Sequence, residues 1–425
     1  MSKYPEYSHT KSREWFDRAL KVIPSGIYGH LGPSEGLFLP LEKWPLISSR
    51  AQGTCFWDMD GNKYIDMMCA YGPNVLGYND PEVDAAAAEQ LKKGNCVTAP
   101  SYKMVECAEL LTDTVESADW AYFMKNGTDA TTFSVLCARA FTGKKKVIFF
   151  KGYYHGNDPW AMKADYPGIL PEDVQNNIIV PWFDMEALER VWQETGGDVA
   201  ALIAQPYDHG NFYDNVCADN GKWQAVRKFC DEHGIVLIFD DVRTGFRLDI
   251  GGSDRYYGIK ADIICFCKAL ANGYNMSAAC GRDFLKAAAS SLSFTGSYWM
   301  SAVPFAACIA TINKMKRLDT PSLFREKGQK FTGALKKAAA ENGFDLVVSG
   351  EPALFYLRIA NDDSLMLHQE WVAECVSRGL FITSHHNHFI NAALTDEDIA
   401  LAADIAFDAF SVVAKRHPES LIKNL

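Results

Sequence analysis

The fold of this chain is decided by the stretch IVLIFDDV, residues 235–242, in which an apolar run leads directly into two adjacent aspartates. A second apolar stretch, DIICFCK at residues 262–268, ends on Lys268. A charged group at the end of a buried strand is costly unless an opposite charge meets it. Because about one helix and one strand separate the two stretches, the side chains of Asp240 and Lys268 can emerge at the same edge of a sheet. A simple salt bridge would explain this pair equally well.

Short apolar runs alternate with helical patterns on both sides of these stretches. The expected strands are Ala121–Met124, Lys146–Phe150, Ala200–Ala204, Ile235–Phe239 and Asp262–Cys267. The expected helices between them include Thr128–Phe141 and Lys222–His233. Continuous apolar strands that are separated by helices predict an α/β fold with a mostly parallel sheet, covered on both faces. Function in such sheets concentrates at the carboxyl ends of the strands.

The two ends of the chain show other patterns. Residues 53–66 predict a β-hairpin, because the sequence Asp-Gly-Asn at residues 60–62 supplies a turn. Beyond about Thr320 the sequence predicts a long charged helix over residues 322–342, two strands, and a last helix that Thr395 caps.

Two further motifs follow strands of the predicted sheet. Residues 125–130 read KNGTDA, and a turn of small residues that opens a helix presents free backbone N–H groups to a phosphate. Residues 151–156 read KGYYHG, where glycines allow close approach and the aromatic rings offer a flat face. A phosphate cradle, a stacking ring, an acid and a lysine together describe one ligand, pyridoxal phosphate.

From about Pro24 to its C-terminus the chain resembles the class III, fold-type I pyridoxal-phosphate-dependent aminotransferases and the related glutamate-1-semialdehyde aminomutases. The family's phosphate turn Ser-Gly-Thr-Glu-Ala corresponds to NGTDA at residues 126–130, and its Tyr-His-Gly motif is kept at residues 154–156. Its motif Asp-Glu-Val…Gly-Phe-Arg appears as DDV at residues 240–242 and GFR at residues 245–247. The resemblance implies a large domain with a mostly parallel seven-stranded sheet and a smaller α+β C-terminal domain.

The resemblance also implies a division of the chain. Residues 1–60 are expected to form an N-terminal segment that contributes to the small domain and the active site. Residues 61–320 are expected to form the large cofactor-binding domain, and residues 321–425 the small domain.

The family pattern implies a role for each matched residue. Lys268 would hold the cofactor as a Schiff base, the internal aldimine, and would move the substrate proton. Asp240 would keep the pyridine nitrogen protonated. The expected cofactor contacts are Asn126, Gly127, Thr128, Tyr154, His155, Asp240, Val242, Lys268 and Ser297. Ser297 would reach the cofactor phosphate of the neighbouring subunit, so a homodimer is expected.

Departures from the family pattern concern the substrate. The aminomutases carry an arginine in the N-terminal Gly/Pro-rich segment, whereas residues 23–32 contain none, which disfavours glutamate-1-semialdehyde. We expect the enzyme to transfer an amino group between an amine or amino acid and an oxo acid or aldehyde. The candidate substrate residues are Tyr28, His30, Tyr71, His386 and His388.

Two other functions use the same residues. A pyridoxal-phosphate-dependent aminomutase or a racemase or epimerase would need the same lysine and acid, and only the requirement for a separate amino acceptor distinguishes them. A binding protein that has lost catalysis is a further alternative, because Asn126 and Asp241 depart from the family motifs.

The composition indicates which binding partners and which cellular compartment to expect. The net charge of −11 disfavours nucleic acid and anionic membranes, which clustered Lys and Arg bind. No apolar run approaches the ~20 residues that cross a bilayer, no signal peptide is visible, and the 12 cysteines are scattered, so a cytoplasmic protein is expected. His385, His386 and His388 crowd one segment, yet without a nearby carboxylate motif we expect no metal site.

Overall fold

A computed structural model describes residues 3–27, 40–218 and 221–422 of the chain. The chain divides into two compact units. We call them the central unit, formed by Pro81–Gly210 and Val216–Pro321, and the terminal unit, formed by the chain up to Asp80, by Asn211–Asn215 and by the chain from Ser322 onward.

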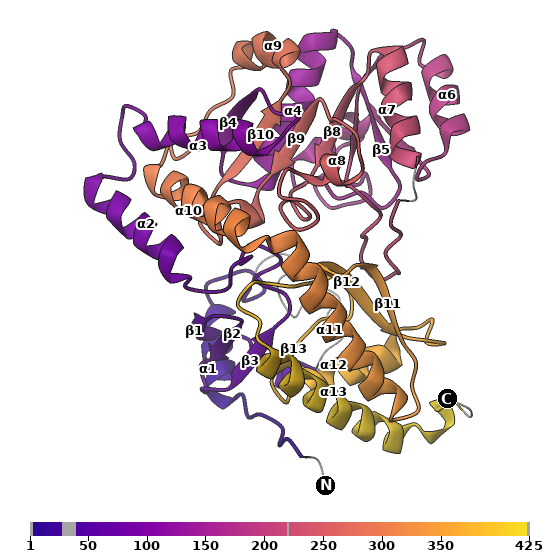
Figure 1. Cartoon of the computed structure of the whole chain (residues 1–425). Coiled ribbons are helices and arrows are strands. Elements are labelled where there is room, and N and C mark those ends of the chain that lie inside the picture. The colour runs from indigo at the N-terminus through magenta and orange to yellow at the C-terminus, as the bar shows by residue number, and fades with distance from the viewer. Residues whose placement is uncertain (1–2, 28–39, 219–220, 423–425) are drawn as a thin grey trace. The chain divides into compact units, whose positions relative to one another are not determined.

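The central unit is built on a seven-stranded sheet with the strand order β4-β10-β9-β8-β7-β5-β6 (Figure 1). The strands are β4 (Trp120–Met124), β5 (Lys146–Phe150), β6 (Asn177–Val180), β7 (Val199–Ala204), β8 (Val236–Asp240), β9 (Ile263–Phe266) and β10 (Ser277–Gly281). Strand β10 runs antiparallel to its neighbours β4 and β9, and the other pairs are parallel. Strands β7, β8 and β9 are buried along their whole length, which explains their continuous apolar sequences. The predicted mostly parallel α/β sheet is confirmed.

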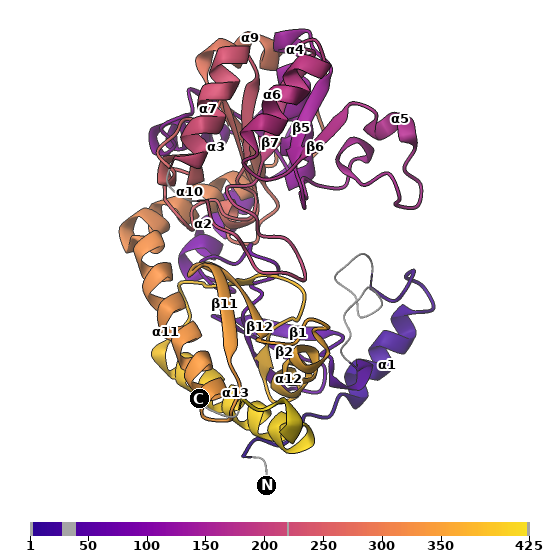
Figure 2. The ribbon, with the colours of Figure 1, turned by 90° about the vertical axis from the view of Figure 1, so that its right-hand side faces the viewer.

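Helices pack on this sheet and along its antiparallel edge. They are α2 (Pro81–Lys93), α3 (Tyr102–Thr114), α4 (Gly127–Thr142), α5 (Pro171–Val174), α6 (Met185–Glu194), α7 (Lys222–His233), α8 (Ser253–Tyr256), α9 (Lys286–Ser291) and α10 (Ala302–Leu318), with short 3-10 turns η3 (Pro159–Ala161), η4 (Lys268–Ala271) and η5 (Asp283–Leu285). Helix α4 crosses strands β4, β10, β9, β8 and β7, and α10 packs against α2 and α3. Helices α6 and α7 lie side by side, α6 against β6 and α7 against β8 (Figure 2).

Local capping explains where helix α4 begins and ends. The Asp129 carboxylate accepts hydrogen bonds from the backbone N–H groups of Asn126 (2.8 Å) and Lys125 (3.1 Å), which fixes the turn before the helix. Gly143 ends the helix with φ 69°, a left-handed conformation that glycine adopts without a steric penalty. The turn before α4 is therefore defined by its own sequence.

The terminal unit contains two small sheets. One has the order β1-β2-β3-β13 and the other β11-β12-β14. The strands are β1 (Ser48–Gln52), β2 (Cys55–Asp58), β3 (Lys63–Asp66), β11 (Leu346–Glu351), β12 (Leu354–Ile359), β13 (Leu380–Phe381) and β14 (His388–Phe389). Strands β2 and β3 pair antiparallel, so the predicted hairpin is confirmed.

The helices of the terminal unit come mainly from the C-terminal part of the chain. They are α1 (Thr10–Ala19), α11 (Thr320–Ala340), α12 (Met366–Val376) and α13 (Asp396–Arg416), with 3-10 turns η2 (Leu41–Lys43) and η6 (Pro418–Ser420). Thr395 caps α13 by accepting a hydrogen bond from the N–H of Asp398 (3.1 Å), as its sequence predicts. Among the helices in the described ranges, none combines the length and the hydropathy that crossing a bilayer requires.

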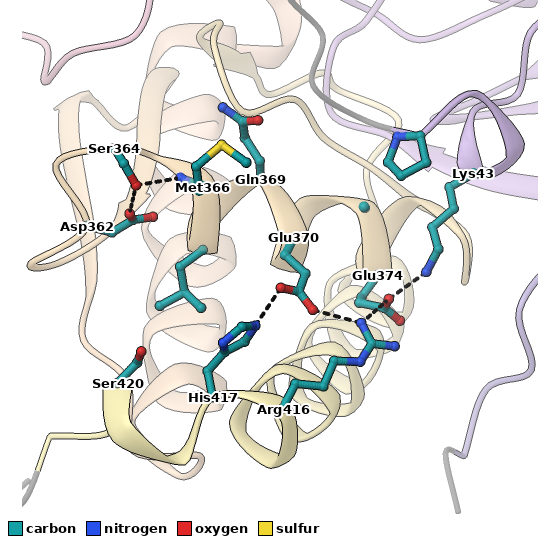
Figure 3. A pocket seen from close by; sticks show the side chains of 13 residues that line it. Lys43, Asp362, Ser364, Met366, Gln369, Glu370, Glu374, Arg416, His417 and Ser420 are labelled. Atoms are coloured by element: carbon teal, nitrogen blue, oxygen red, sulfur yellow. Dashed lines mark hydrogen bonds and ion pairs between the residues drawn. The ribbon is translucent and has the colours of Figure 1, made fainter.

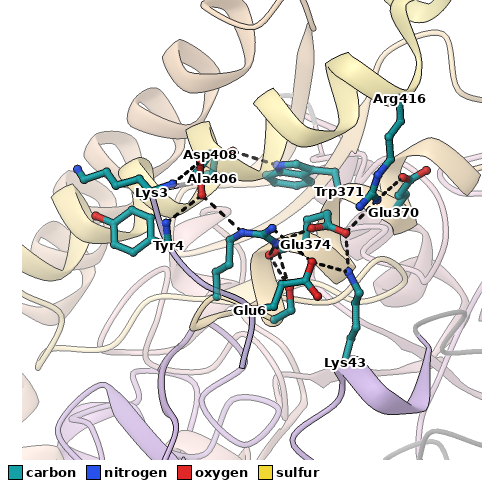
Figure 4. Close-up of polar contacts among 12 residues, drawn as sticks. Lys3, Tyr4, Glu6, Lys43, Glu370, Trp371, Glu374, Ala406, Asp408 and Arg416 are labelled. Atoms are coloured by element: carbon teal, nitrogen blue, oxygen red, sulfur yellow. Dashed lines mark hydrogen bonds and ion pairs between the residues drawn. The ribbon is translucent and has the colours of Figure 1, made fainter. Parts of the chain in front are cut away.

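A charge network on α12 ties the N-terminal segment to the C-terminal helices (Figure 4). The buried carboxylate of Glu374 pairs with Lys43 (2.5 Å), Arg378 (2.5 Å) and Arg416 (3.0 Å). Nearby, the Asp408 carboxylate on α13 accepts the backbone N–H of Lys3 (3.1 Å). Burial by itself would raise the pKa of Glu374, but the hydrogen bonds and charges of its cationic partners lower it. The network therefore holds an ionised carboxylate inside the unit.

Candidate active site

The carboxyl ends of neighbouring strands β8 and β9 carry the predicted acid and lysine. Asp240 is the last residue of β8 and lies opposite Cys265 of β9, and Lys268 follows β9 at the start of η4. Lys268 has φ 38°, and a non-glycine residue in this region is uncommon outside turns and functional sites. The backbone thus leaves the strand sharply at the lysine.

The environment of Lys268 favours its neutral amine. Burial, followed by the positive charge of Arg243, lowers the pKa of Lys268 to about 7, although the charges of Cys267 and Asp240 act in the opposite direction. A lysine with an ordinary pKa is almost entirely protonated at neutral pH and is then neither a nucleophile nor a base. At this site a large fraction of the amine can act as either.

The Asp240 carboxylate is fixed by two hydrogen bonds. Its Oδ2 lies 2.7 Å from Nδ1 of His155, and its Oδ1 accepts the backbone N–H of Val242 at 3.1 Å. Asp240 and His155 are both buried. Because the carboxylate can only accept, the proton of the imidazole lies on Nδ1. Within the described residues, Asp240 is thus paired with His155 and not with Lys268, so a simple salt bridge does not explain the two strand ends.

The predicted phosphate turn packs against the end of β8. A Cβ atom on Gly127 would lie 2.8 Å from Cγ1 of Val242, a distance that real Cβ atoms essentially never show, so a glycine is required for this close approach. Gly127 opens the 16-residue helix α4, whose N-terminal N–H groups and dipole attract an anion.

The loop after β5 lies on the first turn of α4. The backbone N–H of Asn157 donates to Oγ1 of Thr128 (3.1 Å), and Oγ1 of Thr131 donates to the carbonyl oxygen of His155 (2.6 Å). Tyr154, in the same loop, is 44% exposed, which leaves a face of its ring open to a ligand. The structure thus brings together Lys268, Asp240, His155, Tyr154, Val242, Gly127 and Thr128 at one edge of the sheet.

Ser297, the remaining predicted cofactor contact, belongs to the central unit. It sits in the loop between α9 and α10, where it is exposed, and its carbonyl oxygen faces Sγ of Cys96 at 3.7 Å. The backbone N–H of Ala302, at the start of α10, donates to the carbonyl oxygen of Asn95 (2.8 Å), so this loop and the segment before α3 are joined.

Three of the candidate substrate residues, Tyr71, His386 and His388, belong to the terminal unit. The rings of Tyr71 and His386 meet edge to face with centroids 5.2 Å apart. Tyr71 ends a run of three non-glycine residues with positive φ (Cys69, Ala70 and Tyr71), a costly conformation that is found mainly where function requires it. Burial, followed by the charge of Asp66, raises the pKa of Tyr71 to about 12, so its hydroxyl keeps its proton.

The remaining candidates are differently placed. His388 is a buried residue of β14, where its Nε2 accepts the backbone N–H of Thr383 (3.1 Å) and its ring stacks on Phe355. Burial lowers the pKa of His388 to about 3, so the ring is neutral. Tyr28 and His30 lie outside the described residues. A substrate role for any of these residues stays a prediction.

A pocket in the terminal unit contains none of the predicted site residues (Figure 3). Its volume is about 620 Å³, and residues of α12 and η6 line it. Its charged side chains pair with one another: Glu370 lies 2.7 Å from Nε2 of His417 and 2.8 Å from Arg416. These paired charges make it a poor candidate for the reaction.

Sequence reasoning missed two residues beside the lysine. Arg243 follows Val242, and its Nη1 donates to the carbonyl oxygen of His209 at 2.8 Å and lies 3.1 Å from Nδ1 of the same residue. The sequence offered one signal for Arg243, its place in the motif DDVRTGFR at residues 240–247. It offered none for its partner His209, which stands 34 positions earlier.

Comparison with known proteins identifies the family. Residues 40–405 match the family model described as aminotransferase class-III. The chain is a class III aminotransferase. It is 37% identical over 406 residues to the aminopentol aminotransferase of Sphingopyxis macrogoltabida, covering 96% of this chain and 95% of the relative. It is also 31% identical to a glutamate-1-semialdehyde 2,1-aminomutase of Desulforamulus reducens, covering 96% and 99%.

Solved structures agree with this family. The internal aldimine form of the FumI protein of Sphingopyxis sp. MTA144, which contains pyridoxal phosphate, matches with a TM-score of 0.92 and 37% identity over 97% of this chain and 98% of that one. This class III aminotransferase is therefore a pyridoxal-phosphate-dependent enzyme, as the sequence predicted. The glycine-bounded turn before α4, the fixed Asp240 carboxylate and the neutral amine of Lys268 fit this cofactor.

Proposed function

We propose that this aminotransferase moves an amino group from an amine or amino acid to an oxo acid or aldehyde, with Lys268 and Asp240 as its catalytic residues. The observation that carries the proposal is the pair of strand ends at which Lys268, with a pKa of about 7, lies beside the Asp240–His155 pair. The central unit thus offers a base and an ionic anchor at one edge of a single sheet.

Each residue at this edge would hold one part of the cofactor. Asp240, oriented by His155, would pair with the ring nitrogen, and Tyr154 and Val242 would pack on the two faces of the ring. Asn126, Gly127 and Thr128 would hold the phosphate at the N-terminus of α4. The bound cofactor supplies an electron sink for the electron pair that the substrate carbon releases.

Lys268 would do the work of proton transfer. Its Nζ takes the proton from the carbon that bears the amino group and delivers it to the neighbouring reacting carbon. A pKa of about 7 suits both directions of this transfer at neutral pH. The left-handed backbone of Lys268 (φ 38°) fixes where its Nζ can reach, because the chain does not continue as an extended strand at this residue.

We propose an amine as the donor. The relative with 37% identity is named for an aminopentol, a substrate that is an amine and an alcohol. The segment at residues 23–32 lacks the arginine that the aminomutases resembling this chain carry, so this segment offers no cation to a donor carboxylate. An aminomutase or a racemase remains the alternative, because it would use the same lysine and acid.

The visible spectrum of the purified holoenzyme tests the proposal. An amine donor should bleach the absorption band of the bound cofactor, and an oxo acid should restore it. Lys268→Ala should lower the rate of this cycle by about 100- to 10,000-fold, while Lys151→Ala, which removes an exposed lysine after β5, should leave it unchanged. Product formed without any acceptor would instead identify a mutase or a racemase. Wild-type turnover by the Lys268→Ala protein would overturn the mechanism.

We further propose that the enzyme acts as a homodimer. Exposed apolar side chains lie next to Ser297 and next to its neighbour Cys96 in the chain: Tyr298 is 70% exposed, Met300 40% and Val97 44%. A monomer rarely leaves such a surface in water, and a second copy would cover it. Ser297 of the partner subunit would then contribute its hydroxyl to the cofactor phosphate.

A cytoplasmic location is also proposed. All twelve cysteines lie in the described part of the chain, none of them forms a disulfide there, and most of them are buried. Proteins of oxidising compartments commonly pair such residues. The thiol chemistry therefore supports a reducing compartment.

A further inference from the structure

Arg243 is held in a fixed position next to the reacting lysine. The side chain follows strand β8, and its Nη1 donates to the carbonyl oxygen of His209, which follows the neighbouring strand β7 (2.8 Å). A second contact of 3.1 Å joins Nη1 to Nδ1 of His209. The guanidinium is thus anchored across two strand ends of the same sheet edge that carries Lys268.

The contact with Arg243 defines the tautomer of His209. A guanidinium can only donate hydrogen bonds, so Nδ1 is an acceptor and the ring proton lies on Nε2. Burial, followed by the charge of Arg243, lowers the pKa of His209, which keeps the ring neutral. His209 is 1% exposed, and within the described residues its Nε2 has no hydrogen-bond partner. The pair therefore combines a fixed cation with a buried N–H donor.

The charge of Arg243 acts on both groups that would face the substrate. After burial, Arg243 makes the largest contribution to the lowered pKa of Lys268. It also opposes the rise in the pKa of Tyr154 that burial causes. Arg247 acts on Lys268 more weakly and is only 1% exposed, so a substrate cannot approach it, whereas Arg243 is half-buried.

A 2-oxo acid that acts as the second substrate needs a cation at this place. In a 2-oxo acid the carboxylate is bonded to the same carbon that receives the amino group, so it must lie within a few ångströms of the reacting nitrogen. The planar guanidinium matches a carboxylate with two parallel hydrogen bonds and stays charged at every relevant pH. We infer that Arg243, positioned by His209, binds the carboxylate of the oxo acid that accepts the amino group.

This inference rests on the proposed function and adds a specificity to it. The acceptor would be an oxo acid rather than a neutral aldehyde, and Arg243 would supply the carboxylate contact that residues 23–32, which contain no arginine, do not. His209 is a positioning residue, because it acts through the guanidinium.

Separate measurement of the two half-reactions tests the role of Arg243. In the holoenzyme, an amine donor bleaches the visible band, and pyruvate or the neutral aldehyde propanal restores it. Arg243→Gln should raise the half-saturating concentration of pyruvate by about 10- to 100-fold, the loss of one charged hydrogen-bonded contact. When the steps are measured on the pH plateau of each protein, where Lys268 is neutral in both, the amine step and the step with propanal should change by less than about 3-fold, because neither substrate carries a carboxylate. His209→Gln should give a smaller change in the same direction, for pyruvate alone.

Two matched variants serve as controls. Arg243→Lys keeps the charge and should recover part of the pyruvate step. Arg190→Gln removes an equal charge from an exposed position on α6 and should change nothing. Equal slowing of the amine and pyruvate steps, or an unchanged preference for pyruvate over propanal in Arg243→Gln, would overturn the inference.

Binding of an unreactive carboxylate gives a readout that is independent of turnover. Calorimetric titration of the holoenzyme with propanoate should show binding that weakens at least about 10-fold in Arg243→Gln. Equal affinity in both proteins, or no binding to the wild type, would contradict the inference. A wild-type enzyme that binds propanoate but does not transfer amino groups would refute the proposed function and leave the carboxylate site standing.

Discussion

At the scale of single residues, the site depends on protonation states that the surroundings impose. Lys268 is held near neutrality by burial and by Arg243, whereas the carboxylate of Asp240 is fixed by His155 and by the N–H of Val242. The first residue is kept able to accept a proton, and the second is kept in one orientation. These two tasks fall to residues at the ends of the neighbouring strands β8 and β9, and the proposed reaction requires both.

The lowered pKa of Lys268 has a testable pH dependence. Only the neutral amine can react with an aldehyde, and it prevails above the folded-state pKa of about 7. The rate at which cofactor-free enzyme captures added pyridoxal phosphate should therefore rise up to about pH 7 and then level off. Stopped-flow absorbance at a series of pH values measures this rate. In Arg243→Gln the plateau should move to higher pH, because a positive charge beside the amine is gone; a rate that still rises above pH 9 in the wild type would contradict the assignment.

At the scale of the secondary-structure elements, the site is assembled from loops that each follow a different strand. The turn between β4 and α4 meets the end of β8 through Gly127 and Val242, and the loop after β5 is fixed to Thr128. The elements were largely predictable, because β5, β7, β8, β9 and α7 have apolar runs or helical periods of their own. Strand β10, with the sequence SAACG, was not predicted, since its small residues have low β-propensity and only its neighbours β4 and β9 define it. The pairing of Arg243 with His209 was missed for the same reason: it is created by the sheet and not by local sequence.

The close approach of Gly127 and Val242 predicts the outcome of a pair of substitutions. Gly127→Ala places a methyl group 2.8 Å from Cγ1 of Val242 and should displace the turn that we propose as the phosphate site. We expect the affinity for pyridoxal phosphate, measured by fluorescence titration, to fall about 10-fold or more, equivalent to about 1.4 kcal/mol. The double variant Gly127→Ala with Val242→Ala should recover part of this loss, because it removes both Cγ atoms. An absence of recovery would show that the methyl group acts on something other than Val242.

The charge network on α12 predicts a change in stability. Glu374→Gln leaves Lys43, Arg378 and Arg416 around a neutral group, and breaking such a buried network costs about 3 kcal/mol. The folded-state pKa of Glu374 is lowered, so its contribution is present at neutral pH and is lost as the pH falls through that pKa. Urea unfolding should show a large difference between wild type and variant at pH 7 and a smaller one near pH 3. Glu326→Gln, which breaks an exposed pair with Lys330, is the control and should unfold like the wild type.

At the scale of the whole molecule, one chain does not account for every predicted contact. Ser297 is exposed in a loop rimmed by apolar side chains, which the proposed second copy would cover. The sequence suggested this arrangement only through the family resemblance, because no local pattern tells which surface of a chain meets a second copy. The candidate residues Tyr28 and His30 lie outside the described residues, and the contact between Tyr71 and His386 could not be foreseen from positions so far apart.

A charged residue at this surface should separate the copies. Tyr298→Asp would bury a carboxylate in the proposed interface, and we expect analytical ultracentrifugation to show a monomer in place of a dimer. The monomer should also lose pyridoxal phosphate more readily, because Ser297 of the partner subunit no longer reaches the phosphate. The control is Tyr166→Asp, which makes the same change at an exposed tyrosine of the central unit that is distant from Ser297 in sequence. This variant should remain dimeric. A monomeric wild type would refute the proposed assembly.

Cys96 lies in this same region, and among the twelve cysteines, all within the described chain, it alone is exposed. Its neighbour across the joined loops is Ser297. In the proposed homodimer, Cys96 would therefore act as a built-in reporter of assembly. A thiol-reactive dye would attach fastest at Cys96 in a separated chain and would be shielded from it in the proposed pair, so the speed of labelling upon dilution would follow the separation of the two copies without any engineered probe.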